Sequence, residues 1–170
     1  ADMDSIQSIA RKHKIFVVAD AAEAHGACYR DVNVGALGDM VAYSLYVAHI
    51  ISTIEGGVVT TNNPDFAEIL RSLRSHGRAC TCDSCVLNTA SSYCPKRFRD
   101  TDGEDIRFLF ERIGFSSKMN ELEAAVGLGN LGVYKEILDK RRENLGYLMH
   151  NFKRFSPSLN TIEEGKNEVI

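Results

Sequence analysis

The sequence predicts an α/β fold, layered around a parallel β-sheet, from three observations. A helical pattern near the start of the chain leads directly into IFVVA at 15–19, whose continuous apolar character and β-branched residues are typical of a buried parallel strand. Two further strand-like runs follow at 40–46 and 56–61. Along the chain, predicted helical segments come before and after these strands, as in layered α/β proteins. With 170 residues, 44% of them hydrophobic, the chain is long enough for a domain with its own core.

Apolar spacing and capping residues predict the helices. Pro64 suits the first turn of a helix, with Asn62 or Asn63 as its cap. Asn120 begins another helix, and Glu123 is placed as its capping-box partner. The last helix is rich in charge and is expected on the surface. The predicted helices span residues 4–13, 64–76, 120–131 and 133–155.

Charge and hydropathy exclude several classes of protein. Lys and Arg total 20 against 23 Asp and Glu, so no basic face for nucleic acid is expected. No apolar run approaches the ~20 residues of a transmembrane helix, and no signal sequence is seen, so we expect a cytoplasmic protein. The chain starts without Met, inside a helical pattern, and we expect it to be a piece of a longer protein whose N- and C-terminal parts are missing.

Asp20 is the first candidate site residue. It follows a predicted buried strand, and ligands of open α/β sheets bind at the carboxyl ends of such strands. A carboxylate there can pair with the ring nitrogen of a pyridine cofactor and keep that nitrogen protonated. The alternative is an Asp that only caps a helix or a turn.

The segment 43–57 holds the next candidates. Ser44 and Ser52 offer hydroxyl groups, and His49 lies in an apolar stretch before Glu55-Gly56-Gly57. A lone His in such a stretch is more often a packed core residue than a catalyst, so this segment by itself leaves both interpretations open.

A cysteine cluster lies in the long excursion at 77–112, which has little periodicity and a length typical of functional loops. Without a secretion signal, such a cluster indicates a metal or iron–sulfur site rather than disulfides. Four unligated thiols are the alternative. The clustered residues are Cys80, Cys82, Cys85 and Cys94, whereas Cys28 is isolated.

Together these motifs resemble the DegT/DnrJ/EryC1/StrS family of sugar aminotransferases. The family pattern is Asp-Ala-Ala-Gln-Ala-His-Gly, then Val-Gly, Gly-Asp, Ser-Phe, Lys and Glu-Gly-Gly. The segments at 75–78, 113–128 and 140–148 also fit, so the resemblance covers about residues 1–155. The matching positions here are 20–26, Val34-Gly35, Gly38-Asp39, Ser44-Leu45, His49 and Glu55-Gly56-Gly57.

The resemblance implies a three-layer, mostly parallel sheet, as part of the large domain of a fold type I pyridoxal-phosphate enzyme that acts as a homodimer. Residues 1–155 would belong to that domain, with the Cys-rich insertion at 77–112, and 156–170 would begin a connecting segment or tail. Implied roles are pairing of Asp20 with the pyridine nitrogen, Glu23 near the ring hydroxyl and Ser44 at the phosphate. Ser116 stands where the family has an Asn that reaches the partner subunit's cofactor phosphate.

His49 stands at the family's lysine position, and no Lys occurs between Lys14 and Lys96. An aminotransferase needs that lysine for its Schiff base, whereas imidazole acts as an acid or base near neutral pH. Within the family, this replacement resembles the 3-dehydratases of 3,6-dideoxysugar biosynthesis. They bind pyridoxamine phosphate non-covalently, use the His as base, and remove the 3-hydroxyl of a 4-keto-6-deoxy sugar nucleotide.

The cysteine run resembles the insertion of the iron–sulfur subclass, the CDP-4-keto-6-deoxyglucose 3-dehydrases. That resemblance implies a 2Fe-2S cluster on Cys80, Cys82 and Cys94, fed by a flavin and iron–sulfur reductase. The subclass has its remaining ligand at the position of Ala22, so Cys85 is the predicted fourth ligand; zinc suits four thiolates as well. Two rivals stay open: a cluster-independent 3-dehydratase or aminotransferase-like enzyme, and a catalytically dead, zinc-stabilised regulatory protein.

Overall fold

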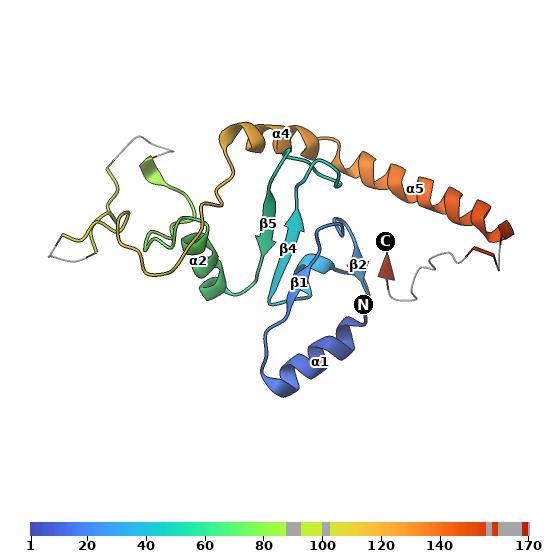
Figure 1. Cartoon of the computed structure of the whole chain (residues 1–170), viewed down its shortest axis with the longest axis horizontal. Coiled ribbons are helices and arrows are strands. Elements are labelled where there is room, and N and C mark those ends of the chain that lie inside the picture. Colours follow the sequence, from blue (N-terminus) through green and yellow to red (C-terminus); the bar gives the residue numbers. More distant parts are fainter. Residues whose placement is uncertain (88–92, 100–102, 156–157, 160–167, 170) are drawn as a thin grey trace. The chain divides into compact units, whose positions relative to one another are not determined.

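The computed structural model describes residues 1–87, 93–99, 103–155, 158–159 and 168–169 (Figure 1). The chain forms two compact units. One combines Ala1–Thr61 with Asn120–Ile170, and the other is Asn62–Met119. The α/β class predicted from the sequence is confirmed.

The first unit is built on a three-stranded sheet of order β1-β4-β5. Strand β1 (Val18–Asp20) pairs in parallel with β4 (Met40–Ser44), which pairs antiparallel with β5 (Gly57–Thr60). The sheet of this chain is therefore mixed rather than mostly parallel. The physical reason is the connection between β4 and β5, which contains no crossover helix, so the chain returns in the opposite direction.

The strand predicted at 15–19 lies further along the chain. Helix α1 (Met3–His13) ends at Lys14, which adopts the left-handed conformation with φ 54°. The backbone N–H of Val17 then donates to the Asp39 carboxylate at 2.7 Å, and the ladder starts only at Val18 opposite Met40. Because β1 pairs with β4 alone among the described strands, Val18 is 65% exposed and not buried as predicted.

A small second sheet has the order β3-β2-β6, with both pairs antiparallel. Its members are β2 (Cys28–Tyr29), β3 (Val32–Asn33) and β6 (Glu168–Val169). The 3₁₀ helix η1 (Val34–Ala36) follows β3 and leads into β4. The sequence did not predict these short strands, because two residues are too few to show an alternating pattern.

Helix α4 (Glu121–Leu131) begins with the predicted capping box. The Asn120 side chain accepts from the Glu123 N–H at 2.9 Å, and the Glu123 carboxylate accepts from the Asn120 N–H at 3.1 Å. Helix α5 (Tyr134–Phe152) and the 3₁₀ helix η2 (Lys153–Phe155) follow. Helix α5 has no buried residue, as its charge content predicted.

The loop between β4 and β5 is fixed against α4, which crosses the end of these strands in Figure 1. Thr53 is 2% exposed, and its hydroxyl donates to the Glu55 carbonyl at 2.6 Å. The Asn130 side chain donates to the Ser52 carbonyl at 3.1 Å. Gly127 faces the Thr53 side chain so closely that an added Cβ would lie 2.6 Å from its methyl group. This packing sets the position of the loop that carries His49.

Gly127→Ala is expected to lower the free energy of unfolding by about 1–3 kcal/mol, because the buried, β-branched Thr53 cannot rotate away from the new methyl group. Urea-induced unfolding measures the change. The matched control is Gly129→Ala in the same helix, where an added Cβ meets nothing within 4 Å. There the higher helix propensity of Ala should raise stability by up to about 1 kcal/mol. Equal effects of the two variants would contradict the packing argument.

The second unit begins with helix α2 (Pro64–Leu73), which Asn63 caps by accepting from the N–H groups of Asp65 and Phe66. After the helix, the described residues of this unit form isolated bridges rather than strands, among them Ser75 with Ser116. Two glycines allow the close approach of its backbone segments, since a Cβ on Gly77 would lie 1.8 Å from the Arg112 carbonyl oxygen and one on Gly114 would lie 2.0 Å from the Gly77 nitrogen. Ser72, fully buried, donates to the Arg78 carbonyl at 2.8 Å.

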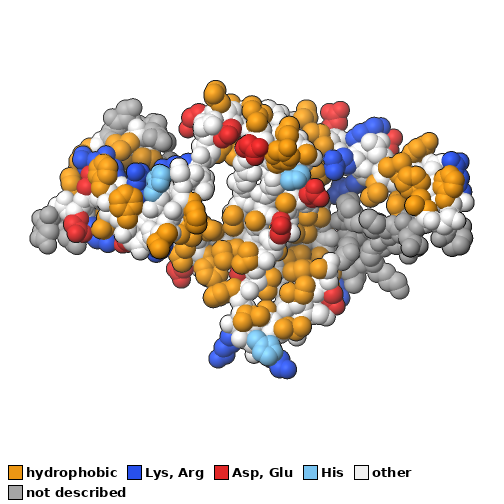
Figure 2. Space-filling model, in the orientation of Figure 1, with side chains coloured by type: hydrophobic (Ala, Val, Ile, Leu, Met, Phe, Trp, Pro, Cys, Tyr) orange, Lys and Arg blue, Asp and Glu red, His pale blue; other side chains and the backbone are white. Residues whose placement is uncertain are grey.

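Hydrophobic side chains are exposed on many elements, as the face in Figure 2 shows. Helix α4 alone exposes Leu122 (80%) and Leu128 (70%). Within the described residues, no helix combines the length and the apolar character needed to cross a membrane.

Candidate active site

Asp20 lies at the carboxyl end of β1, where the sequence placed it. Its Oδ1 accepts from the Ala22 N–H at 3.0 Å, which starts a turn after the strand. The buried Ala21 continues the ladder by donating to the Ala42 carbonyl at 2.8 Å, so the turn is tied to β4. The Asp20 side chain is therefore held at the edge of the sheet.

A cavity of about 760 Å³ lies beside this turn. Its lining residues include Asp20 and Glu23, together with Arg141 and Arg142 of α5, but not Ser44 or His49. Arg142 also donates to the Gly26 carbonyl at 3.1 Å, which holds α5 over the turn. The cavity thus combines a mainly apolar wall with charges of both signs, a lining suited to a polar aromatic ligand.

Ser44 closes β4, one strand away from Asp20. Its hydroxyl oxygen accepts from the Tyr46 N–H at 3.2 Å, so the hydroxyl hydrogen is left to donate to another group. Its carbonyl oxygen lies 2.8 Å from Nε2 of His25, whose ring packs on Tyr43 with centroids 4.9 Å apart. His25 therefore fixes the backbone at Ser44. The sequence analysis included His25 in the motif at 20–26 but did not predict that it holds the backbone of Ser44. The only sequence signal for His25 was its place in that motif, five residues after Asp20.

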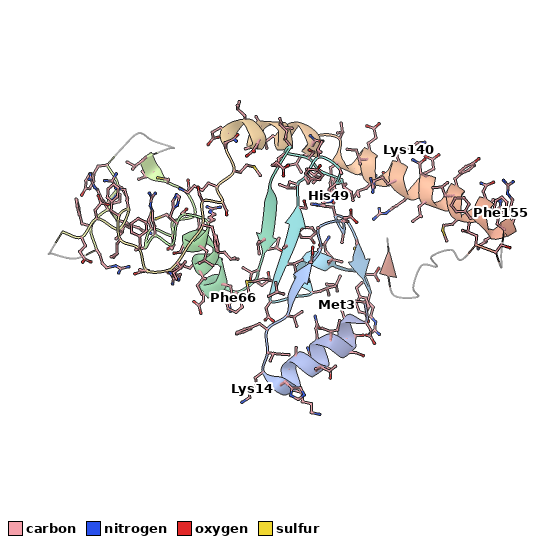
Figure 3. All side chains as sticks on the ribbon, in the orientation of Figure 1. Met3, Lys14, His49, Phe66, Lys140 and Phe155 are labelled. Carbon is pink, nitrogen blue, oxygen red and sulfur yellow. The ribbon has the colours of Figure 1, made fainter. Side chains whose placement is uncertain are left out.

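His49 lies in the loop after β4, as Figure 3 shows. Its backbone N–H donates to the Tyr46 carbonyl at 2.9 Å, and the two rings meet edge to face with centroids 5.8 Å apart. The side chain is 16% exposed. Nε2 lies 3.5 Å from Oε1 of Glu23, whose side chain is 83% exposed. Among the described residues, Nδ1 is buried and has no hydrogen-bond partner.

Nδ1 of His49 is buried without a hydrogen-bond partner among the described residues. Buried polar atoms in proteins are nearly always hydrogen-bonded, so this nitrogen keeps an unused capacity to accept or donate a hydrogen bond. Glu23 on the other nitrogen gives the imidazole a charge partner when it is protonated. The arrangement suits proton transfer at His49.

The residues present fit a pyridine cofactor. Asp20 offers a carboxylate at the end of a parallel strand, Ser44 a free hydroxyl hydrogen, and His49 a nitrogen without a partner. Ser116, the remaining predicted phosphate contact, lies in the second unit. It is exposed there, and its backbone bridges to Ser75.

The four predicted metal ligands all lie in the second unit. Burial raises the pKa of the Cys80 thiol, and the neighbouring Cys82 and Cys85 add to this effect. Cys85 is exposed, whereas Cys80, Cys82 and Cys94 are of intermediate exposure. Over the described part of the chain, no three His, Cys, Asp or Glu side chains are placed to hold a metal.

A charged cluster not predicted from the sequence lies beside the cysteines. Asp105 accepts from Arg107 at 2.6 Å and from Arg97 at 2.9 Å. These two guanidinium groups, Arg107 first, hold the pKa of Asp105 well below its ordinary value. The Cys80 and Cys94 thiols lie close enough to Arg107 to raise its pKa. The cluster thus fixes the loop in which the thiols lie.

Curated proteins from other organisms match most of this chain. The chain is 37% identical over 146 residues to a dTDP-4-dehydro-2,6-dideoxy-D-glucose 3-dehydratase of Saccharopolyspora spinosa, covering 83% of this chain and 31% of that protein. It is 35% identical over 153 residues to a GDP-perosamine synthase of Caulobacter vibrioides, covering 90% and 35%. The chain thus spans about a third of the length of these curated relatives.

A solved structure shows the same fold. The GDP-4-keto-6-deoxy-D-mannose-3-dehydratase of E. coli, solved with bound hydrated PLP, superimposes with a TM-score of 0.72 at 26% identity, covering 90% of this chain and 38% of that one. The DegT/DnrJ/EryC1/StrS aminotransferase family matches residues 1–169. With the match extending over nearly its whole length, the chain belongs to this family.

Proposed function

We propose that the full-length protein is a pyridoxamine-phosphate-dependent 3-dehydratase of a 4-keto-6-deoxy sugar nucleotide, with His49 as the base. The observation that carries this proposal is the buried, unpartnered Nδ1 of His49 at the family's lysine position. Two relatives with 3-dehydratase in their names, one of them solved with PLP, support the reaction class and the cofactor.

The absence of a lysine in this stretch favours dehydration over transamination. No Lys occurs between Lys14 and Lys96, so the described site offers no amine for a covalent bond to an aldehyde cofactor. The GDP-perosamine synthase is a relative of similar identity, so family membership alone does not separate the two reactions. The residue at position 49 carries the distinction.

Each residue has a proposed task that follows from its position. When bound, the cofactor supplies a protonated pyridine ring that accepts the electron pair of a broken bond. Asp20 binds the ring nitrogen and keeps it protonated. Ser44 donates its hydroxyl hydrogen to the phosphate, with His25 holding its backbone. His49 accepts a proton at Nδ1, and α5 and α4 hold the surrounding turn and loop in place.

The iron–sulfur cluster is predicted from the resemblance of the cysteine run alone. The described residues contain no arrangement that could hold a metal, and the position of the subclass's remaining ligand is Ala22. The ligand set Cys80, Cys82, Cys85 and Cys94, a reductase partner, a homodimer and a Ser116 contact with the partner subunit's cofactor stay predictions from the resemblance.

The proposal is tested by incubating the full-length protein with pyridoxamine phosphate and 4-keto-6-deoxy sugar nucleotides. The expected product has lost its 3-hydroxyl, which mass spectrometry detects as loss of water or oxygen. An amino sugar formed from glutamate, with no deoxygenated product, would contradict it. Iron and zinc analysis of the same anaerobic preparation tests the cysteine ligand set independently, because a metal-free protein that still dehydrates its substrate needs no cluster.

A further inference from the structure

Two side chains that depart from the family pattern meet in this structure. His49 replaces the family's Lys, and Glu23 stands where the pattern has Gln. They come from different segments, the turn after β1 and the loop after β4, yet Nε2 of His49 lies 3.5 Å from Oε1 of Glu23. We propose that Glu23 is a positioning residue that fixes the tautomer of His49 and makes Nδ1 the basic atom. This inference rests on the proposed function.

The argument starts from the two nitrogens of a neutral imidazole, of which one carries the proton and the other a lone pair. An ionised carboxylate only accepts hydrogen bonds. With a carboxylate oxygen beside Nε2, the proton is favoured on Nε2, and the lone pair is then on Nδ1. Nδ1 is also the atom that is buried without a partner among the described residues.

The two side chains of the pair differ in their exposure to solvent. The His49 side chain is 16% exposed, whereas the Glu23 side chain is 83% exposed. Glu23 also lines the cavity that Asp20 lines. The carboxylate therefore reaches the imidazole from the solvent side, while Nδ1 stays shielded from water.

The proton balance of the proposed step is simple. When bound, the cofactor would take up the electron pair of the broken C–H bond, and Nδ1 of His49 would take up the proton in a new N–H bond. The imidazolium then has Nε2–H facing the Glu23 carboxylate, which stabilises the positive charge. The same proton can leave with the 3-hydroxyl group as water, which restores the neutral imidazole.

The test uses ¹⁵N-histidine labelling of the full-length protein without cofactor, with the His49→Asn spectrum identifying the His49 signals. In the parent protein, the neutral ring should show Nε2 as the protonated nitrogen and Nδ1 as the pyridine-type nitrogen. Glu23→Ala should produce a mixture of both tautomers. Glu23→Gln keeps an oxygen that can accept from Nε2–H, so the tautomer should be retained while the charge is lost.

Kinetic measurements distinguish the effect of the Glu23 charge from the effect of the His49 tautomer. Glu23→Gln should lower kcat by about fivefold, the scale of an ion pair with one exposed partner, with little change in KM. Glu23→Ala should lower it further. The matched control is Asp31→Asn, which removes the same charge from an exposed turn in the left-handed conformation that Asn tolerates, and it should change neither measurement.

Either of two results would overturn the inference: a parent ring protonated on Nδ1, or a Glu23→Ala variant with unchanged tautomer and unchanged kcat. If Glu23→Ala does not fold, Glu23→Gln still decides through kcat. A parent protein without dehydratase activity would refute the proposed function, and the spectra would still report the tautomer separately.

Discussion

His49→Asn is expected to lower the rate of C-3 dehydration by about 10²- to 10⁴-fold, the contribution of a positioned general base. Asn is close to His in size but has no titratable nitrogen, so the loop between β4 and β5 should keep its contacts with α4. Binding of pyridoxamine phosphate, measured by equilibrium dialysis, should change little, because Asp20 and Ser44 are intact. A His49→Asn variant with the parent rate would show that His49 is a packing residue.

The reciprocal change tests the same position through covalent chemistry. His49→Lys supplies the primary amine that the described site lacks, so the aldehyde form of the cofactor should become attached to the protein. Reduction with borohydride fixes that bond, and mass spectrometry of the digested protein locates it. Attachment at position 49 would place this residue at the cofactor's reactive carbon. Attachment elsewhere would contradict the assignment.

Asp20→Asn is expected to lower kcat by about two to three orders of magnitude, the scale of losing a preorganised electrostatic contact. The neutral amide cannot keep the pyridine nitrogen protonated, so the ring accepts electrons poorly. The fold should be unaffected, because the Asn oxygen can still accept from the Ala22 N–H, as Oδ1 of Asp20 does at 3.0 Å.

The absorbance of the bound cofactor, followed as a function of pH, measures this effect directly. In the parent protein the ring nitrogen should stay protonated over a wider pH range than in Asp20→Asn. The control is Asp39→Asn, because Asp39 accepts from the Val17 N–H in the connection to β1, away from the strand's carboxyl end. If Asp20→Asn binds cofactor and turns over normally, Asp20 serves only the turn.

The sequence by itself determined the local structure and the family. The apolar runs at 40–46 and 56–61 located β4 and β5, and the pair Asn120 and Glu123 located the start of α4, because these features depend on contacts within a few residues. The ordered motifs from Asp20 to Gly57 identified the family that the comparison confirmed. The position of Asp20 at the carboxyl end of β1 also followed from the sequence.

Only the tertiary structure decided how distant segments meet. The antiparallel direction of β5, the approach of Glu23 to Nε2 of His49 and the burial of Nδ1 depend on the path of the loop that Thr53 and Gly127 fix. Sequence patterns record local hydrogen bonding and burial, whereas the geometry of a site depends on packing between segments, which no local pattern contains.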